Sequence, residues 1–197
     1  MARRGGERLR WYKRIFNRGP DVSSGYNKIE LISDNGSGFY SWNGDLYSSD
    51  VIRSCIRPKA KAIGKLVAKH IRESADGLKI NPEPYIRVLL EEPNPFMTGQ
   101  MMQEKLATQL ALNNNAFALI YRDENGYPYQ IYPIPANSVQ AIIDKAGYLF
   151  LRFNLRTGKI LTVPYTDIIH LRQDYNDNDV FGDAPSEVLR SLMEIVT

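Results

Sequence analysis

The sequence predicts an α+β protein in which amphipathic helices come first and antiparallel strands follow. Between residues 50 and 113, apolar residues recur at the spacing of one helix face. From residue 116 to residue 171, short runs rich in β-branched and aromatic residues are separated by turn signals. Helices and strands that are segregated along the chain are typical of the α+β class.

The composition is that of one globular body. The chain has 197 residues, of which 43% are hydrophobic and 24% charged, enough for one sizeable core. Its single cysteine, Cys55, excludes an intramolecular disulfide. No apolar run reaches transmembrane length, and none follows the basic N-terminus as it would in a secretory signal. We therefore expect a soluble intracellular protein that does not bind membranes.

Positive charge is concentrated at the N-terminus. Residues 1–20 hold seven basic residues and one acidic residue, a net charge of +6, so the remaining residues carry −3 within the total of +3. The basic residues are Arg3, Arg4, Arg8, Arg10, Lys13, Arg14 and Arg18. We expect residues 1–25 to form a flexible arm that either contacts DNA or an acidic partner, or stays solvated. The mildly acidic body, residues 26–197, argues against a domain that wraps nucleic acid.

The first predicted helix begins at Ser48-Ser49-Asp50. Before it, residues 20–49 have the Gly, Ser and Asn content of a linker or loop, with short aromatic islands such as GFYSW and room for one short strand. The apolar face of the helix is formed by Ile52, Cys55, Ile56, Ile63, Leu66, Val67 and His70. A basic stripe on the opposite side is formed by Arg53, Arg57, Lys61, Lys65 and Lys69. The stripe is either a ridge that binds phosphate or a partner, or a solvated helix face. Cys55 is expected to be a buried, inert thiol and His70 a hydrogen-bonded core residue.

A rigid connector follows the second predicted helix, residues 83–91. This helix must end by Glu92, because Pro93 disfavours helical geometry in the residue before it. Pro93, Asn94 and Pro95 restrict the backbone more than a short polar turn would. The connector either holds two helices at one angle for an assembly or is a stiff turn beneath a domain core.

The third predicted helix begins at Thr98, a good N-cap. Met97 and Met102 stand at the two positions of a hydrophobic staple, which fixes the angle at which the chain enters the helix. Its buried side is formed by Met102, Leu106, Ala107, Leu110 and Ala111. The helix fades in residues 113–115, three asparagines that accept left-handed geometry.

Strands follow. AFALIYR and YPYQIYPI flank a hairpin turn at Asn125-Gly126, and further strands are predicted at residues 139–143, 148–153, 159–163 and 168–171. Pro128 and Pro133 cannot donate to a ladder, so their strand is expected either at a sheet edge or with a kink. A last helix, unfinished at Thr197, is predicted after Gly182, with Pro185 in its first turn.

No set of residues predicts catalysis, a cofactor or a metal. The chain has only two histidines, and His170 lies on a predicted strand, either facing the surface or beneath another element. No Gly-rich phosphate loop occurs. Asp174, Asn176 and Asn178 match the first ligands of a calcium loop, but Asp179 and Pro185 stand where such a loop needs Gly and Glu. We therefore expect a solvated acidic loop and a protein that is not an enzyme.

Five stretches, in order, resemble the portal protein family of tailed double-stranded DNA bacteriophages. SSDVIRSCIRPKAKAIGKL is similar to the family's opening helix, and LLEEPNPFMTGQMM to its Leu-Leu, Pro-Asn-Pro and Met-Thr signature. NNNAFALIYRDENGYPYQIYPIPANSV resembles its Asn-Ala-aromatic strand and Arg-x-x-x-Gly turn, and DIIHLR and VFGDAPSEVL its later landmarks. The structural residues that the resemblance singles out are Pro93, Asn94, Pro95, Met97, Thr98, Asn115, Gly126, Gly182 and Pro185. Asn114 and Ala184 depart from the family's usual Gly and Ser.

The resemblance implies a structural subunit of a dodecameric portal ring at one capsid vertex of the virion, assembled in the host cytoplasm. Double-stranded DNA would enter and leave through the channel of the ring. The implied partners are the terminase packaging motor, capsid and scaffold proteins, and the head–tail adaptor. This chain would be the outer α+β wing, truncated before stem, clip and crown. The alternatives are a nucleic-acid-binding module that uses the basic arm and stripe, and an unrelated α+β enzyme or scaffold that shares these turns.

Overall fold

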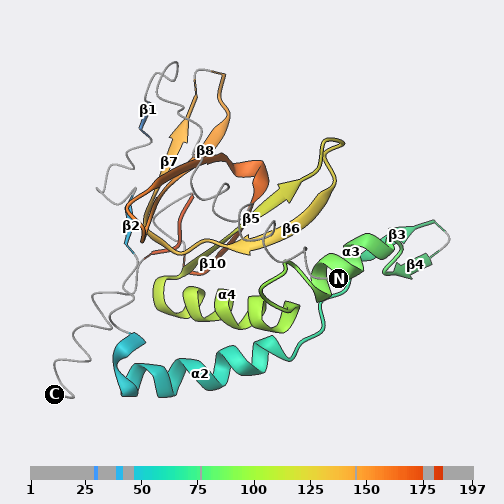
Figure 1. The fold of residues 1–197 in the computed structure, drawn as a ribbon, viewed down its shortest axis with the longest axis horizontal. Coiled ribbons are helices and arrows are strands. Elements are labelled where there is room, and N and C mark those ends of the chain that lie inside the picture. The colour runs from blue at the N-terminus through green and yellow to red at the C-terminus, as the bar shows by residue number, and fades with distance from the viewer. Residues whose placement is uncertain are drawn as a thin grey trace, which may run out of the picture.

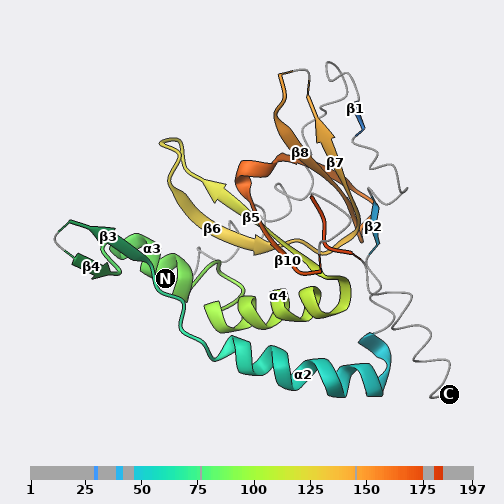
Figure 2. The ribbon, with the colours of Figure 1, turned by 180° about the vertical axis from the view of Figure 1, so that it is seen from behind.

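The computed structural model describes residues 29–30, 39–41, 47–75, 77–144, 146–174 and 180–183. Most of their elements form three layers (Figure 1): helix α2 (Asp50–Gly64) is lowest, helix α4 (Gly99–Asn113) lies above it, and the strands of the two larger sheets lie above α4. Figure 2 shows the same layers from behind. The predicted α+β class is confirmed. The arm predicted for residues 1–25 and the helix predicted from Pro185 onward lie outside the described residues.

Helix α2 begins where the sequence predicts but ends earlier. Gly64 closes it at a point of close approach, where an added Cβ would lie 2.4 Å from Cγ of Glu104 in α4. Leu66 and Val67 follow in an exposed segment. The predicted continuation to His70 is therefore wrong: the apolar spacing runs on past a glycine of low helix propensity, but no element among the described residues covers that face.

Only a narrow strip of α2 is buried, because α2 packs chiefly against α4. The strip consists of Ile52, Ile56, Ala60 and Gly64, at a spacing of four residues. Cys55 lies beside the strip and is exposed, so the predicted burial of its thiol is wrong. An amphipathic pattern gives the centre of a buried face but not its width, which depends on how many elements cover it.

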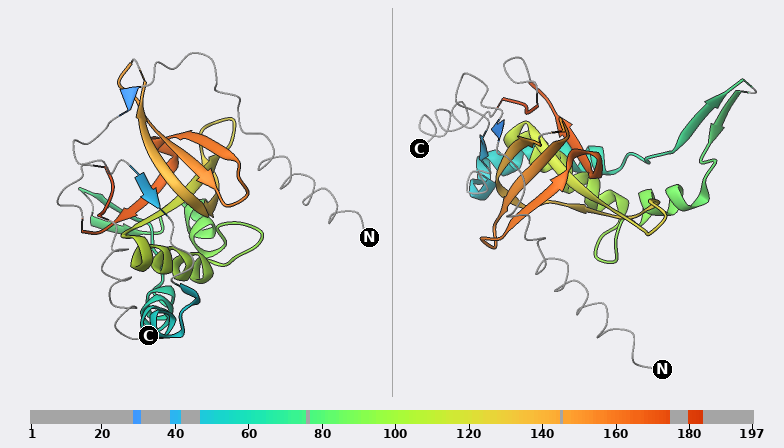
Figure 3. Two further views of the ribbon diagram at one scale, coloured as in Figure 1. Left: turned by 90° about the vertical axis from the view of Figure 1, so that its left-hand side faces the viewer. Right: turned by 90° about the horizontal axis from the view of Figure 1, so that it is seen from above.

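A two-stranded hairpin that the sequence did not predict follows α2. Strands β3 (Ile71–Ser74) and β4 (Gly77–Ile80) pair with each other alone and are exposed throughout. Seen from above, the hairpin extends away from the rest of the described chain (Figure 3, right). His70 lies at its base, half-buried, and not on a helix face as predicted.

The next two helices match their predictions. Helix α3 spans Pro84–Glu91, with Glu83 as its N-cap and Glu92 as its C-cap. The hydroxyl of Thr98, the N-cap of α4, accepts from the backbone N–H of Met101 at 3.4 Å. Helix α4 carries apolar residues on several sides because α2 lies below it and a sheet above it. It ends at Asn114, whose φ of 53° is left-handed.

The predicted strands divide between two sheets. In the first, of order β10-β5-β6, β5 (Asn115–Arg122) and β6 (Pro128–Pro133) form the predicted hairpin, and β10 (Ile168–Arg172) pairs with the other side of β5. Gly126, at φ 84°, lies in the turn. The predicted edge position of the proline-containing strand β6 is confirmed.

The second sheet is built on the meander of β7 (Ala136–Ile143), β8 (Leu149–Leu155) and β9 (Ile160–Pro164). Strands β1 (Ile29–Glu30) and β2 (Phe39–Ser41) both pair with β7, so the described residues before α2 form two short strands where the sequence predicted room for one. A 3-10 turn, η2 (Tyr165–Asp167), leads from β9 to β10 and so connects the two sheets.

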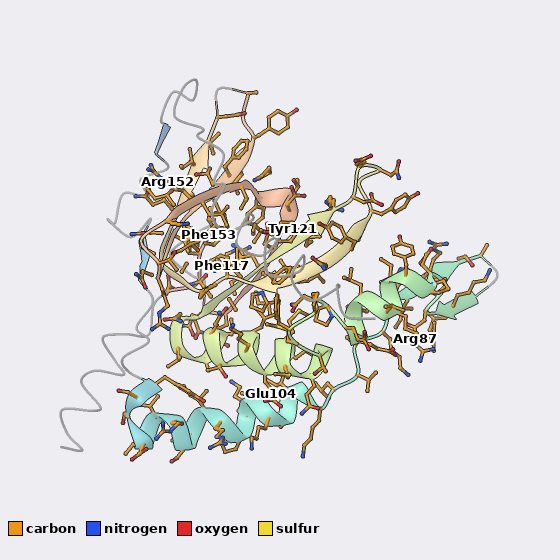
Figure 4. The ribbon with its side chains drawn as sticks, viewed as in Figure 1. Arg87, Glu104, Phe117, Tyr121, Arg152 and Phe153 are labelled. Carbon is orange, nitrogen blue, oxygen red and sulfur yellow. The ribbon has the colours of Figure 1, made fainter. Side chains whose placement is uncertain are left out.

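The main core lies between the two sheets. Figure 4 shows Phe117 of β5 and Phe153 of β8 approaching each other there, with ring centroids 5.3 Å apart in an edge arrangement. A second apolar cluster lies between α3, α4 and the first sheet, and a third between α2 and α4. None of the helices in the described part of the chain has the length and apolar content to span a bilayer.

Candidate functional site

The Pro-Asn-Pro connector between α3 and α4 is bound to the edge of the first sheet. Ile131 of β6 donates its backbone N–H to the carbonyl of Pro93 at 2.8 Å. Asn94 returns the bond, donating Nδ2–H to the carbonyl of Ile131 at 2.7 Å. The connector therefore pairs with β6 almost as a further strand would, and protects part of an exposed edge.

The same asparagine closes the turn. Oδ1 of Asn94 accepts from the backbone N–H of Phe96 at 3.0 Å, an arrangement in which a side chain imitates a backbone turn. Asn94 and Pro93 are buried, and Met97 packs with Met102 against the second apolar cluster. The structure thus supports the interpretation of the connector as a stiff turn beneath a core.

Gly99 brings the end of α3 against the start of α4. A Cβ at Gly99 would lie 2.1 Å from the backbone carbonyl oxygen of Leu90, so any side chain here would push the two helices apart. Together, Gly99 and the bonds of Asn94 fix the angle between α3 and α4. That this fixed angle serves the assembly of several subunits stays a prediction.

A buried polar junction joins the end of α4, strand β10 and residues 180–183. Asn115, fully buried, donates Nδ2–H to the carbonyls of Gly182 at 2.7 Å and Asn113 at 3.0 Å. Its Oδ1 accepts from the backbone N–H of Gly182 at 2.8 Å and lies 3.0 Å from Nε2 of His170. One amide side chain thus satisfies four groups from three parts of the chain.

These bonds determine the protonation of His170. Because Oδ1 of Asn115 can only accept, Nε2 of His170 carries the proton, and Nδ1 accepts from the hydroxyl of Tyr165 at 3.1 Å. The ring stacks on Phe117, with centroids 4.4 Å apart. Burial, with a smaller effect of the nearby Arg172, lowers the pKa of His170 to about 4. His170 is therefore a neutral structural residue beneath other elements at pH 7.

The neighbouring asparagine completes the junction. Asn114 donates Nδ2–H to the carbonyl of Asp183 at 2.7 Å and accepts from Nε2–H of Gln173 at 2.6 Å. A Cβ at Gly182 would lie 2.2 Å from the carbonyl oxygen of Gln173 and 2.4 Å from that of Asn114. Backbone contacts on two sides therefore fix the position of Gly182.

An open aromatic groove of about 700 Å³ lies between α3 and the tip of the β5–β6 hairpin. It is lined by Tyr85, Val88, Leu89, Glu92, Asp123, Tyr127, Pro128 and Tyr129. The rings of Tyr85 and Tyr127 meet edge to face at 5.8 Å across it. Tyr121 of β5 packs instead against the main core, where burial raises its pKa to about 12, so its phenol stays protonated.

The predicted basic stripe is shorter than expected. Only Arg53, Arg57 and Lys61 lie on α2, since Lys65 and Lys69 follow its end, and Arg53 forms an ion pair with Asp50. The unbroken five-residue ridge is therefore wrong, and the binding role of these residues stays a prediction. The basic residues of the arm lie outside the described residues.

No metal centre emerges in the described residues. They contain no group of three or more His, Cys, Asp or Glu that could hold a metal ion. Of the weak calcium motif, Asp174 is described: it accepts from Asn114 at 3.2 Å through Oδ2. Asn176, Asn178 and Asp179 lie outside the described residues.

The sequence did not predict that the residues of the junction, or those of the groove, would lie together. Asn115 and Gly182 were both singled out by the resemblance, but nothing in one sequence signals that residues 67 positions apart bond to each other. The groove consists of side chains from α3 and from the β5–β6 hairpin. Its one sequence signal is the high tyrosine content of residues 121–132.

Comparison with solved structures finds the same fold. The chain resembles a chain in the neck of an empty gene transfer agent particle computed with C6 symmetry, with a TM-score of 0.60, 15% identity, and coverage of 78% of this chain and 42% of that one. A chain in the neck of the native particle, computed with C12 symmetry, gives 0.59, 12%, 88% and 44%. An HK97 family phage portal protein from Corynebacterium diphtheriae gives 0.48, 14%, 80% and 49%.

The chain thus spans less than half the length of these solved chains. A comparison with curated protein sequences finds no match. The family model described as phage portal protein matches residues 50–197, which is well over half of the chain. The resemblance stated from the sequence motifs is thereby confirmed: this chain belongs to the phage portal protein family.

Proposed function

We propose that this chain is the wing of a portal subunit, one of the identical subunits that form a ring at a capsid vertex of the virion. The observation that carries the proposal is the family match over residues 50–197. The fold adds support, because it resembles chains in particle necks computed with sixfold and twelvefold symmetry. Portal proteins are structural, which agrees with the expectation that the chain is not an enzyme.

In this role the ring forms the channel through which double-stranded DNA is packaged and later ejected. It docks the terminase motor during filling and the head–tail adaptor afterwards, and it meets capsid and scaffold proteins during assembly in the host cytoplasm. No residue of this chain would need to catalyse a reaction, because ATP hydrolysis belongs to the motor.

The physics of a ring favours the rigid features of this fold. Small differences in the shape of each subunit accumulate around a closed ring, since each heterologous contact repeats the same rotation. The connector at Asn94 and the junction at Asn115 each hold two elements at a fixed angle through buried hydrogen bonds. Such bonds are costly to break, so they resist distortion under load.

The test is the mass of the assembled protein. The product of the complete reading frame that contains this sequence should form a closed oligomer, twelve subunits by analogy with the C12 neck, when its mass is measured by native mass spectrometry. A monomeric product that binds DNA tightly, with an affinity falling steeply as salt rises, would contradict the proposal and favour the nucleic-acid-binding alternative.

A further inference from the structure

The aromatic groove between α3 and the tip of the β5–β6 hairpin leaves large side chains in contact with solvent. Its exposed members are Tyr85 (44% exposed), Val88 (57%), Tyr127 (56%) and Tyr129 (46%). Its volume of about 700 Å³ is within the range of pockets that hold ligands. Exposed apolar surface gathered in one hollow indicates a binding site, and the faces of tyrosine rings attract cations.

The charges that line the groove are all negative. Its charged members are Glu92 and Asp123, and neither carboxylate takes part in an ion pair within the described part of the chain. The basic residues that precede them on the same elements, Arg87 and Arg122, are each paired with another carboxylate. The groove therefore favours an occupant that combines positive charge with apolar or aromatic side chains.

One segment of this chain has that composition. Residues 8–16, RLRWYKRIF, contain four basic residues, no acidic residue, and five apolar or aromatic residues. The other strongly basic stretch, residues 53–61, is part of α2 and contains no aromatic residue. Nucleic acid is disfavoured as the occupant, because two carboxylates repel its phosphates.

The linker that follows this segment is long enough to reach the groove. Residues 17–28 connect the segment to β1, and a chain of that length spans about 40 Å when extended. A compact domain of 197 residues has a radius of gyration of about 16 Å, so the linker is comparable in length to the whole body. A tethered segment also meets a groove on its own chain at an effective concentration in the millimolar range, so even a weak contact is occupied.

We propose that residues 8–16 dock into the aromatic groove of the same chain, with basic side chains against the tyrosine rings and the two carboxylates. A docked arm is withheld from phosphate, so the groove and nucleic acid compete for the same basic residues. This inference goes beyond the proposed ring, because the contact is made within one chain.

Disulfide trapping within one chain tests the contact. The product of the complete reading frame is made in a cysteine-free background, which includes Cys55→Ser in this sequence, and carries Asn17→Cys together with Val88→Cys. We expect oxidation to give a monomer with an internal disulfide, identified by mass spectrometry as a cross-linked peptide. The control carries Asn17→Cys with Ile160→Cys, because Ile160 is 51% exposed on β9 and does not line the groove. Its disulfide should form about tenfold more slowly or not at all.

Two tyrosines in matched turns test the aromatic part of the contact. Tyr127 donates its backbone N–H to Oδ1 of Asp123 at 2.8 Å, and Tyr148 donates in the same way to Oδ1 of Asp144 at 2.8 Å. Of the two, only Tyr127 lines the groove. In the trapping protein, Tyr127→Ala should slow disulfide formation by about fivefold or more, and Tyr148→Ala should leave the rate unchanged. Both variants should unfold near the wild-type temperature, since both side chains are exposed.

Three results would overturn the proposal. The first is a disulfide to Val88→Cys that forms no faster than the one to Ile160→Cys. The second is equal slowing by Tyr127→Ala and Tyr148→Ala. The third is covalent dimers from a mixture of Asn17→Cys protein and Val88→Cys protein with no internal disulfide in the double variant, which would assign the groove to the arm of another copy. The mass of the wild-type assembly tests the ring separately: a fast internal disulfide without a ring would refute the proposed function and leave this contact standing.

Discussion

Replacing Asn115 by alanine should destabilise the protein strongly, because this side chain satisfies four buried groups. The substitution leaves the N–H and the carbonyl of Gly182, the carbonyl of Asn113 and Nε2–H of His170 without their partner. A buried polar group left unpaired costs about 1–3 kcal/mol. Relaxation and water would recover part of this, so we expect a loss of roughly 3–5 kcal/mol, a large fraction of the ~5–15 kcal/mol typical of domains.

Urea denaturation followed by circular dichroism measures this loss. With a slope of about 2–3 kcal/mol per molar urea, the midpoint should fall by roughly 1–2 M. Asn154, an exposed asparagine on β8, provides the matched control, and Asn154→Ala should change stability by less than about 0.5 kcal/mol. Asn115→Asp keeps the shape but places an acceptor against two carbonyls, so it should be at least as damaging as Asn115→Ala.

The reasoning would be refuted by a loss at Asn115→Ala no larger than that at Asn154→Ala. That result would mean that residues 180–183 do not depend on the junction in solution. A large loss at Asn115→Ala together with a tolerated Asn115→Asp would also contradict it, since the cost would then come from a cavity and not from the hydrogen bonds.

Three further predictions concern pH, the connector and the cysteine. The pKa of His170 is lowered to about 4 in the folded state from an ordinary 6.5, so the neutral ring stabilises the fold above pH 6.5 and this contribution, roughly 3 kcal/mol at most, is lost as pH falls toward 4. His170→Gln should therefore make the urea midpoint depend less on pH between 6.5 and 4. An unchanged pH dependence would contradict the lowered pKa of His170. Pro93→Ala with Pro95→Ala should lower thermal stability modestly; if rings of the full-length protein still form normally, the connector has no assembly role. Cys55 should react with a thiol reagent in the native protein nearly as fast as in urea, and strong protection would contradict its exposure.

The sequence predicted the elements of the body well where local rules operate. Thr98 and Asn114 mark the ends of α4, and Gly126 marks the β5–β6 turn, because caps and turns depend on a few adjacent residues. Pro128 and Pro133 predicted an edge strand because proline cannot donate to a ladder.

The sequence failed where tertiary contacts decide. Leu66 and Val67 continue the helical period, but α2 ends at Gly64, and no local rule says which apolar residues will find a partner. The hairpin of Ile71–Ser74 and Gly77–Ile80 was missed although Asp76-Gly77 is a hairpin turn signal and Leu78, Lys79 and Ile80 alternate, because both strands are only four residues long.

Candidate function depended on the resemblance more than on any single residue. Composition and charge argued against a disulfide, a membrane span and a domain that wraps nucleic acid, but they did not point to any functional site. The motif around Pro93, Asn94 and Pro95 indicated a rigid connector, and the structure shows how: Asn94 bonds to β6 at 2.7 Å. Why that geometry would matter for a ring follows from physical reasoning about repeated contacts.

The most direct test of the central claim is negative-stain imaging of the product of the complete reading frame. A portal subunit predicts ring-shaped particles with a central hole, with twelve subunits by analogy with the C12 neck. Small, separate particles at all concentrations and salt conditions would contradict the claim that this chain is the wing of a portal ring.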